Sequence, residues 1–171
     1  YGPQKMQADK AWDIWSPKAT VNIAIVDTGV DYNHPDIAGK LLKNASGAVV
    51  GYNVITKVAS GQDDHWHGTH CAGIAAASIN NNLGIAGIAG WNPTIANSND
   101  FVRVMPVKVL DSTGSGSDLT VANGITWAAD NGAHVISMSL GGTGSSTTLA
   151  NAVTYAQNKN VVVVAASGNS G

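Results

Sequence analysis

Four nearly continuous apolar runs of strand length constrain the fold of this chain more than any other feature. Such runs are typical of strands that are buried on both faces of a parallel sheet. Helical patterns separate them, and strands that alternate with helices of this length indicate βαβ units. The sequence therefore predicts an α/β fold with a mainly parallel central sheet. The predicted strands span residues 21–26, 102–110, 134–140 and 161–166, and the predicted helices span 118–130 and 149–159, with another that begins at His67 and ends near Asn80.

The remaining segments are assigned from their turn-forming and apolar residues. Residues 1–3 read as a turn or an extended entry, because Gly2 and Pro3 follow the first residue. Apolar residues on one face predict a short helix over 8–15. The polar stretch 51–66 predicts an exposed loop that leads to His67, and 91–100 predicts a surface excursion.

Composition limits the classes of protein to which the chain can belong. Its 171 residues are 44% hydrophobic and only 12% charged, which suits one tightly packed domain or part of one. A formal net charge of −2 gives no reason to expect a nucleic-acid partner. No apolar run is long enough to span a membrane, so no membrane partner is expected. Cys71 is the single cysteine, which excludes an internal disulfide.

A histidine and an aspartate stand where an α/β fold collects its functional groups. His67 begins a helix of small residues, in which Gly68 and Gly73 allow close approach to neighbouring backbone. We expect this helix to be buried and to hold the imidazole in one orientation, as proton transfer requires. Asp27 ends the first predicted strand, and functional groups gather at the carboxyl ends of such strands. The sequence therefore predicts that Asp27 is the partner of a general base at His67.

Other interpretations of the same residues exist. Asp-Thr-Gly at 27–29 resembles the signature of aspartic proteases, but those enzymes are all-β and need two such carboxylates. His67, His70 and Cys71 share a helix face and form a possible zinc site. The alternative assignments are a hydrogen-bonded core histidine at position 70 and a small buried side chain at position 71.

Four segments carry a family resemblance that covers nearly the whole chain. Residues 25–29, 67–70, 139–142 and 166–169 resemble, in this order, the signatures of the subtilisin-like serine proteases. The opening Tyr1-Gly2-Pro3-Gln4 and Cys71 resemble the branch that includes thermitase and proteinase K. The resemblance implies a three-layer fold with helices on both faces of the sheet.

The resemblance also implies roles for individual residues. Asp27 would orient the imidazole, His67 would take the proton of a serine nucleophile, and Asn169 would donate its amide to the oxyanion. Two backbone segments would hold an extended protein or peptide substrate by strand addition. These segments are Gly114-Ser115-Gly116 and Ser139-Leu140-Gly141.

The serine nucleophile of this family lies in a Gly-Thr-Ser-type motif downstream of the oxyanion asparagine. Residues 1–171 contain no such motif, so we interpret them as the N-terminal part of a single peptidase domain that ends before the nucleophile helix. We expect this chain alone to be inactive and to need a C-terminal companion polypeptide that carries the serine. A propeptide or a proteinaceous inhibitor is a further possible partner, and the resemblance implies secretion.

A structural calcium ion is the cofactor that the resemblance implies. Asp36 would supply a carboxylate, Asn81 a side-chain oxygen, and Ile79, Leu83 and Ile85 their carbonyl oxygens. Oxygen ligands of this kind suit Ca²⁺. A second calcium loop, around Asn53 and Lys57, is not expected.

The sequence thus predicts a serine endopeptidase that acts by a Ser-His-Asp mechanism. One alternative is a catalytically inactive subtilisin-like domain that binds peptides or partner proteins in its groove. Another is a flavodoxin-like nucleotide binder that uses residues 141–144 as a phosphate loop.

Overall fold

The computed structural model describes residues 2–14, 19–89 and 101–169. A five-stranded, all-parallel sheet organises them, in the order β2-β3-β1-β4-β5. The strands are β1 (Val21–Asp27), β2 (Tyr52–Asn53), β3 (Val102–Lys108), β4 (Val135–Met138) and β5 (Val162–Ala165). The helices are α1 (Gly2–Lys5), α2 (Ala8–Ile14), α3 (His67–Ala76), α4 (Asp118–Asp130) and α5 (Thr147–Asn158), with a short 3₁₀ turn at Ala38–Lys40.

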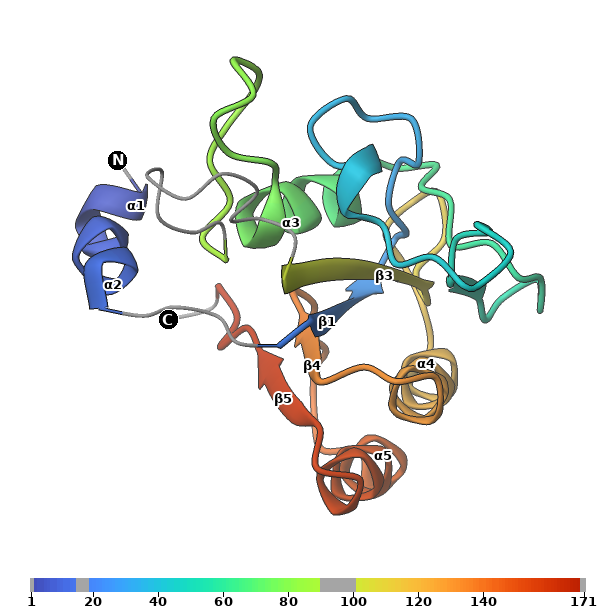
Figure 1. Ribbon diagram of the computed structural model, residues 1–171. Helices are drawn as coiled ribbons and strands as arrows, with labels where there is room; N and C mark the ends of the chain where they lie inside the picture. Colours follow the sequence, from blue (N-terminus) through green and yellow to red (C-terminus); the bar gives the residue numbers. More distant parts are fainter. Residues whose placement is uncertain (1, 15–18, 90–100, 170–171) are drawn as a thin grey trace.

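Helices cover both faces of the sheet, as the three-layer prediction requires. Figure 1 shows α3 on one face and α4 and α5 on the other. The central strand β1 serves both layers: Val26 packs in the core beneath α4 and α5, and Ile25 packs in the core beneath α3. This alternation follows the period of two along a strand. The α/β fold predicted from the sequence is therefore confirmed.

Helix α4 has the bounds that the sequence predicts, since it is capped at both ends. The Ser117 side chain accepts a hydrogen bond from the Thr120 amide, and the Thr120 hydroxyl oxygen accepts one from the Ser117 amide. The N-cap is thus Ser117, one residue before Asp118. At the other end, Asn131 closes the helix through bonds to Trp127 and Ala128.

Helix α3 is shorter and less buried than predicted. It ends at Ala76, because the chain turns away so that the Ser78 amide can bond to the carbonyl of Asp36. The prediction of a fully buried helix is wrong for one face, where His70 and Ile74 are exposed. The small residues Ala72 and Ala76 pack against the sheet, as expected.

Two local predictions are also wrong. The N-terminal residues form helix α1, since proline at its second residue fits the first turn of a helix. The segment 51–66 is not only an exposed loop: it contains β2, which pairs with β3, and Val54 is buried behind it. The predicted surface excursion at 91–100 and the last residue of the predicted helix 8–15 lie outside the described residues.

No helix within the described ranges is long and apolar enough to cross a membrane.

Candidate active site

Asp27 lies at the carboxyl end of the central strand β1, completely buried. Its Oδ1 atom accepts hydrogen bonds from the Thr28 amide at 2.7 Å and from His67 Nδ1 at 2.8 Å. Its Oδ2 atom is also buried and has no hydrogen-bond partner within the described part of the chain. A buried carboxylate held in this way has one fixed orientation, with Oδ1 toward the imidazole.

His67 is the first residue of α3, forty residues after Asp27. Its side chain is 33% exposed, whereas that of Asp27 is 1% exposed, so the pair runs from the interior to the surface. With Nδ1 bonded to a carboxylate, the neutral ring carries its proton on Nδ1 and leaves Nε2 as the proton acceptor. This is the orientation that a general base needs.

Asp63 holds the segment that leads into α3. Its carboxylate accepts hydrogen bonds from the amides of His65, Trp66 and Thr69 and from the hydroxyls of Thr28 and Thr69. Although burial acts to raise its pKa, these bonds, with that from the Thr69 hydroxyl the strongest, bring the pKa of Asp63 below its ordinary value. This role was not predicted, because Asp63 lies four residues before the first residue of α3 and not at its N-cap, Trp66.

Gly68 brings α3 against the loop after β1. Its amide donates to the Thr28 hydroxyl at 2.9 Å. A Cβ atom at this position would lie 2.1 Å from the carbonyl oxygen of Gly29. Only glycine permits this approach, so the small residue at 68 is a condition for the 2.8 Å contact between His67 and Asp27.

A cleft of about 680 Å³ opens beside His67. All six residues predicted to bind substrate line it, together with Thr28, His65 and His67. The two predicted segments follow β3 and β4 and so meet at the carboxyl edge of the sheet. The six are Gly114, Ser115, Gly116, Ser139, Leu140 and Gly141.

Asn169 is not brought to this cleft. It follows β5, is exposed, and is not one of the residues that line the cleft. Its predicted role as an oxyanion donor therefore stays a prediction. Trp66 is also absent from the cleft: it is 63% exposed, stacks on His65 with ring centroids 5.1 Å apart, and lines a second cavity.

Cys71 lies beneath the imidazole, with Sγ 3.9 Å from His67 Nδ1. Burial is the main cause that raises the pKa of this thiol, and the negative charges of Asp27 and Asp63 add to it. The thiol therefore stays protonated and is a poor nucleophile at neutral pH.

The proposed zinc triad of His67, His70 and Cys71 does not assemble. In the described ranges the one group of at least three potential metal ligands is Asp27, His67 and Cys71. The ring of His70 instead meets Trp66 edge-on, with centroids 6.4 Å apart. The prediction that His70 is a core histidine is wrong as well, because its side chain is exposed.

Part of the predicted calcium site converges on Asp36, which is 2% exposed. Its Oδ1 accepts from the Asn81 side-chain amide at 2.7 Å and its Oδ2 from the Ile85 amide at 3.0 Å. The Leu83 amide donates to Asn81. The loop between them curls tightly, with positive φ at Asn80, Asn82 and Gly84. Among the described residues, Ile79 makes no hydrogen bond to this group.

Comparison with known proteins decides the family. The model of the subtilase family, Peptidase_S8, matches residues 18–171. The chain belongs to the subtilase family. Thermitase from Thermoactinomyces vulgaris is 52% identical over all 171 residues, which make up 55% of that protein. The cell wall-associated protease of Bacillus subtilis (strain 168) is 48% identical over 149 residues, 87% of this chain and 15% of that protein.

A solved structure supports the same assignment. The crystal structure of a cold-adapted subtilisin-like serine proteinase matches with a TM-score of 0.68 and 32% identity, over 89% of this chain and 48% of that one. The present chain thus spans about half the length of thermitase and of this proteinase. The subtilase match leaves no basis for the nucleotide-binding or aspartic-protease interpretations.

Proposed function

We propose that this subtilase chain supplies the acid–base half of a serine endopeptidase. The observation that carries the proposal is the 2.8 Å contact between buried Asp27 and partly exposed His67, at the edge of a cleft. Asp27 orients the imidazole and stabilises the imidazolium that forms. His67 Nε2 takes the hydroxyl proton of a serine, whose oxygen bonds to the carbonyl carbon of the substrate, and later gives that proton to the leaving amine.

The substrate is a protein segment in extended conformation. It lies in the cleft between Gly114-Ser115-Gly116 and Ser139-Leu140-Gly141 and pairs with their backbone as an added strand. Three of these six residues are glycines, which leaves room for the substrate backbone. Asn169 serves as the oxyanion donor, and such a donor typically contributes about 3 kcal/mol to transition-state stabilisation.

The serine comes from a C-terminal companion that completes the domain, and residues 1–171 are inactive without it. Residues 1–171 match 55% of thermitase, which is consistent with a serine that lies outside these residues. A propeptide or a proteinaceous inhibitor occupies the same cleft when present. The complex acts outside the cell, in line with a relative that is named a cell wall-associated protease.

A calcium ion stabilises the loop around Asp36. The residue types suit this ion, because a buried carboxylate, an amide side chain and the carbonyls of Ile79, Leu83 and Ile85 can all supply oxygen ligands. The Asn81 amide turns its nitrogen toward Asp36, so it would have to reverse to offer its oxygen to the ion. Both groups seen donating to the Asp36 carboxylate are neutral, so a cation there would balance its charge. Removal of calcium with a chelator should lower the melting temperature, and Asp36→Asn should abolish that calcium dependence.

Labelling with a serine-directed fluorophosphonate, followed by intact mass spectrometry, tests the proposed activity. We expect a companion polypeptide to take up the label, this chain to remain unlabelled, and His67→Ala in this chain to prevent labelling of the companion. An intact companion that binds this chain but takes no label would contradict the proposal. That outcome would favour an inactive peptide-binding subtilase, which equilibrium binding of unlabelled peptides would then establish.

A further inference from the structure

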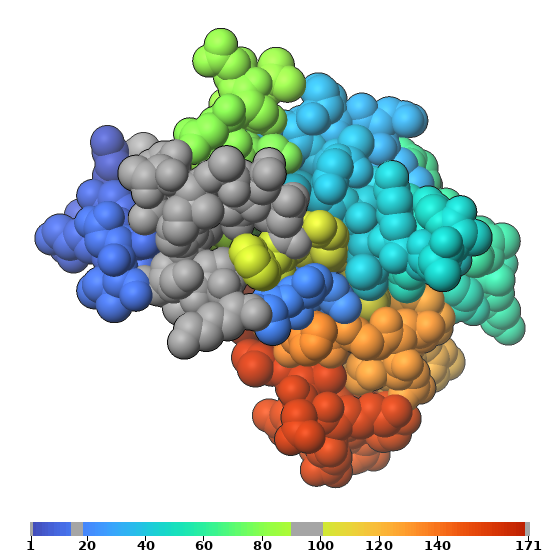
Figure 2. Space-filling model, in the orientation of Figure 1, coloured from blue at the N-terminus to red at the C-terminus, as the bar shows by residue number. Residues whose placement is uncertain are grey.

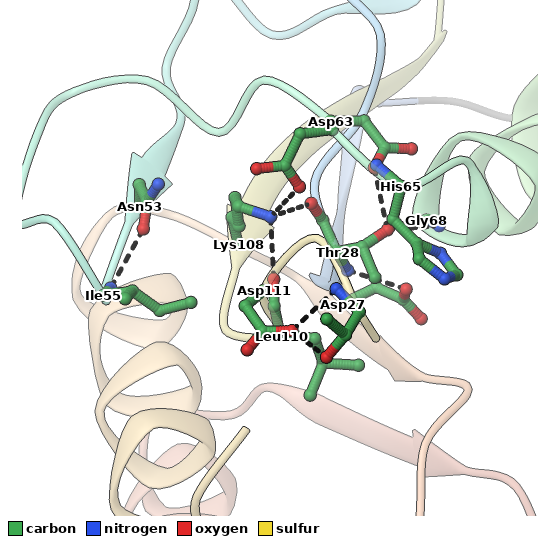
Figure 3. Close-up of polar contacts among 12 residues, drawn as sticks. Asp27, Thr28, Asn53, Ile55, Asp63, His65, Gly68, Lys108, Leu110 and Asp111 are labelled. Carbon is green, nitrogen blue, oxygen red and sulfur yellow. Dashed lines mark hydrogen bonds and ion pairs between the residues drawn. The ribbon is translucent and has the colours of Figure 1, made fainter. Parts of the chain in front are cut away.

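Lys108 is a buried cation at the end of β3 that the proposed chemistry does not use. It is 3% exposed, and its ammonium donates to three oxygens: the Thr28 carbonyl at 2.9 Å, the Leu110 carbonyl at 2.8 Å and Asp64 Oδ1 at 2.5 Å. Figure 3 shows dashed lines from the ammonium to Thr28 and Leu110, which lie on two sides of it. All three donors of the ammonium are therefore used.

The three acceptors belong to the three segments that build the site. Thr28 follows Asp27 directly, and Leu110 leads into the Gly114-Ser115-Gly116 side of the cleft. Asp64 lies in the segment between β2 and His67. One ammonium thus fixes the separation of the chain segments that carry the carboxylate, the imidazole and one wall of the cleft.

Backbone hydrogen bonds also join the ends of β1 and β3, and they require the same spacing between the two segments. The amides of Val109 and Leu110 both donate to the carbonyl of Asp27, at 2.8 and 3.2 Å. Asp27 and Lys108 are also register partners in the parallel pair β1–β3. Without the ammonium, the carbonyls of Thr28 and Leu110 would lose a buried donor and repel each other, which would open the loop after β1.

We propose that Lys108, with Asp64, is a positioning residue that sets the distance and angle between Asp27 and His67. This inference rests on the proposed protease function, but its geometry is independent of the missing serine. Misplacement of reacting groups by about 1 Å can reduce a rate by about 10²-fold. The effect should appear in kcat more than in KM, because the ammonium bonds directly to the segments that carry Asp27 and His67, at Thr28 and Asp64, and reaches the cleft wall only through the Leu110 carbonyl.

The test uses the complete protease, that is, this chain together with its serine-bearing part. We expect Lys108→Met to lower kcat by about 10²-fold and Asp64→Ala by about tenfold, with KM nearly unchanged. Lys43→Met, at an exposed lysine, is the matched control and should leave kcat unchanged. Asp64 has a half-exposed side chain, so Asp64→Ala should fold even if Lys108→Met does not.

A spectroscopic readout separates positioning from general stability. The ¹H NMR signal of the His67 Nδ1 proton reports its hydrogen bond to Asp27, and we expect it to shift or broaden in Lys108→Met and Asp64→Ala but not in Lys43→Met. Variants that lose only melting temperature, while kcat and this signal remain those of the wild type, would overturn the inference. An inactive wild-type protein would contradict the proposed function instead, and the NMR signal would still decide the role of Lys108.

Discussion

Two parts of the same sheet edge differ in how they are held. After β1 and β3, side chains of Thr28, Asp63 and Lys108 join the loops to one another and to α3. After β4 and β5, a Cβ atom added at the described glycines would meet nothing within 4 Å. These glycines are Gly141, Gly142, Gly144 and Gly168.

The strands show the same contrast. The central strand β1 is buried at its carboxyl end, whereas Val162 and Val164 of β5 are 58% and 52% exposed. Figure 2 shows β5 and α5, in red, projecting at the lower edge of the molecule. The chain thus preorganises the carboxylate and imidazole by its own contacts, while the Ser139-Leu140-Gly141 wall of the cleft has few such contacts.

The largest effect should come from removing the charge of Asp27, at the end of β1. In the complete protease, Asp27→Asn should lower kcat by about 10⁴-fold, because an amide favours the wrong tautomer of the imidazole. Steady-state hydrolysis of a peptide substrate measures this. Asp9→Asn, at an exposed position of α2, is the control. Activity near the wild-type level in Asp27→Asn would show that the Asp27–His67 contact is not catalytic.

A glycine comparison tests the difference in packing directly. Gly68→Ala should reduce the free energy of unfolding by about 3 kcal/mol, since the new methyl group would overlap the backbone carbonyl of Gly29. Gly142→Ala, which has open space around it, should change the free energy by less than about 1 kcal/mol. Urea unfolding measures both. Equal effects would mean that the two parts of the sheet edge are packed alike.

The Asp63 network should have a smaller and pH-dependent effect. Because the folded protein lowers the pKa of Asp63, the ionised carboxylate stabilises the native state above the unfolded pKa of about 4, and this contribution is lost as the pH falls further. Asp63→Asn should therefore cost about 2 kcal/mol at pH 7. Unfolding measured between pH 3 and 7 should show the two proteins converging at the acidic end. A constant difference across this range would contradict the role of the charge.

The smallest effect should be on the exposed strand. Val162→Thr should change the free energy of unfolding of the 171-residue chain by less than about 0.5 kcal/mol. The matched substitution Val104→Thr, at a fully buried position of β3, should cost about 2 kcal/mol because it buries a hydroxyl. If both variants lose the same stability by urea unfolding, β5 is covered in solution and the comparison fails.

Much of the fold was predictable because the signals that specify it are local. The apolar run 21–26 becomes β1 almost residue for residue, and the predicted helix 118–130 is α4 with the same bounds. The errors arise where distant contacts overrule local preference. Strand β2 has only two residues and exists through its pairing with β3, and α3 stops early because Ser78 bonds to Asp36.

The sequence predicts candidate site residues but not the contacts that hold them in place. Asp27 and His67 were identified from strand-end and helix-start positions and then from the family motifs. Asp63 was missed beside them, and Lys108 lies within the predicted strand 102–110 with no motif around it. Nothing local indicates that this lysine turns inward to meet Thr28 and Leu110.

The sequence by itself determined the parallel α/β architecture and the subtilase motifs, and it predicted the acid–base pair, because periodicity and short motifs are properties of neighbouring residues. Only the tertiary structure decided that the carboxylate and the imidazole, forty residues apart, meet at 2.8 Å. That distance depends on strand register, on the missing Cβ of Gly68 and on one buried ammonium. Each of these joins segments that are far apart in the chain, so no local pattern specifies them.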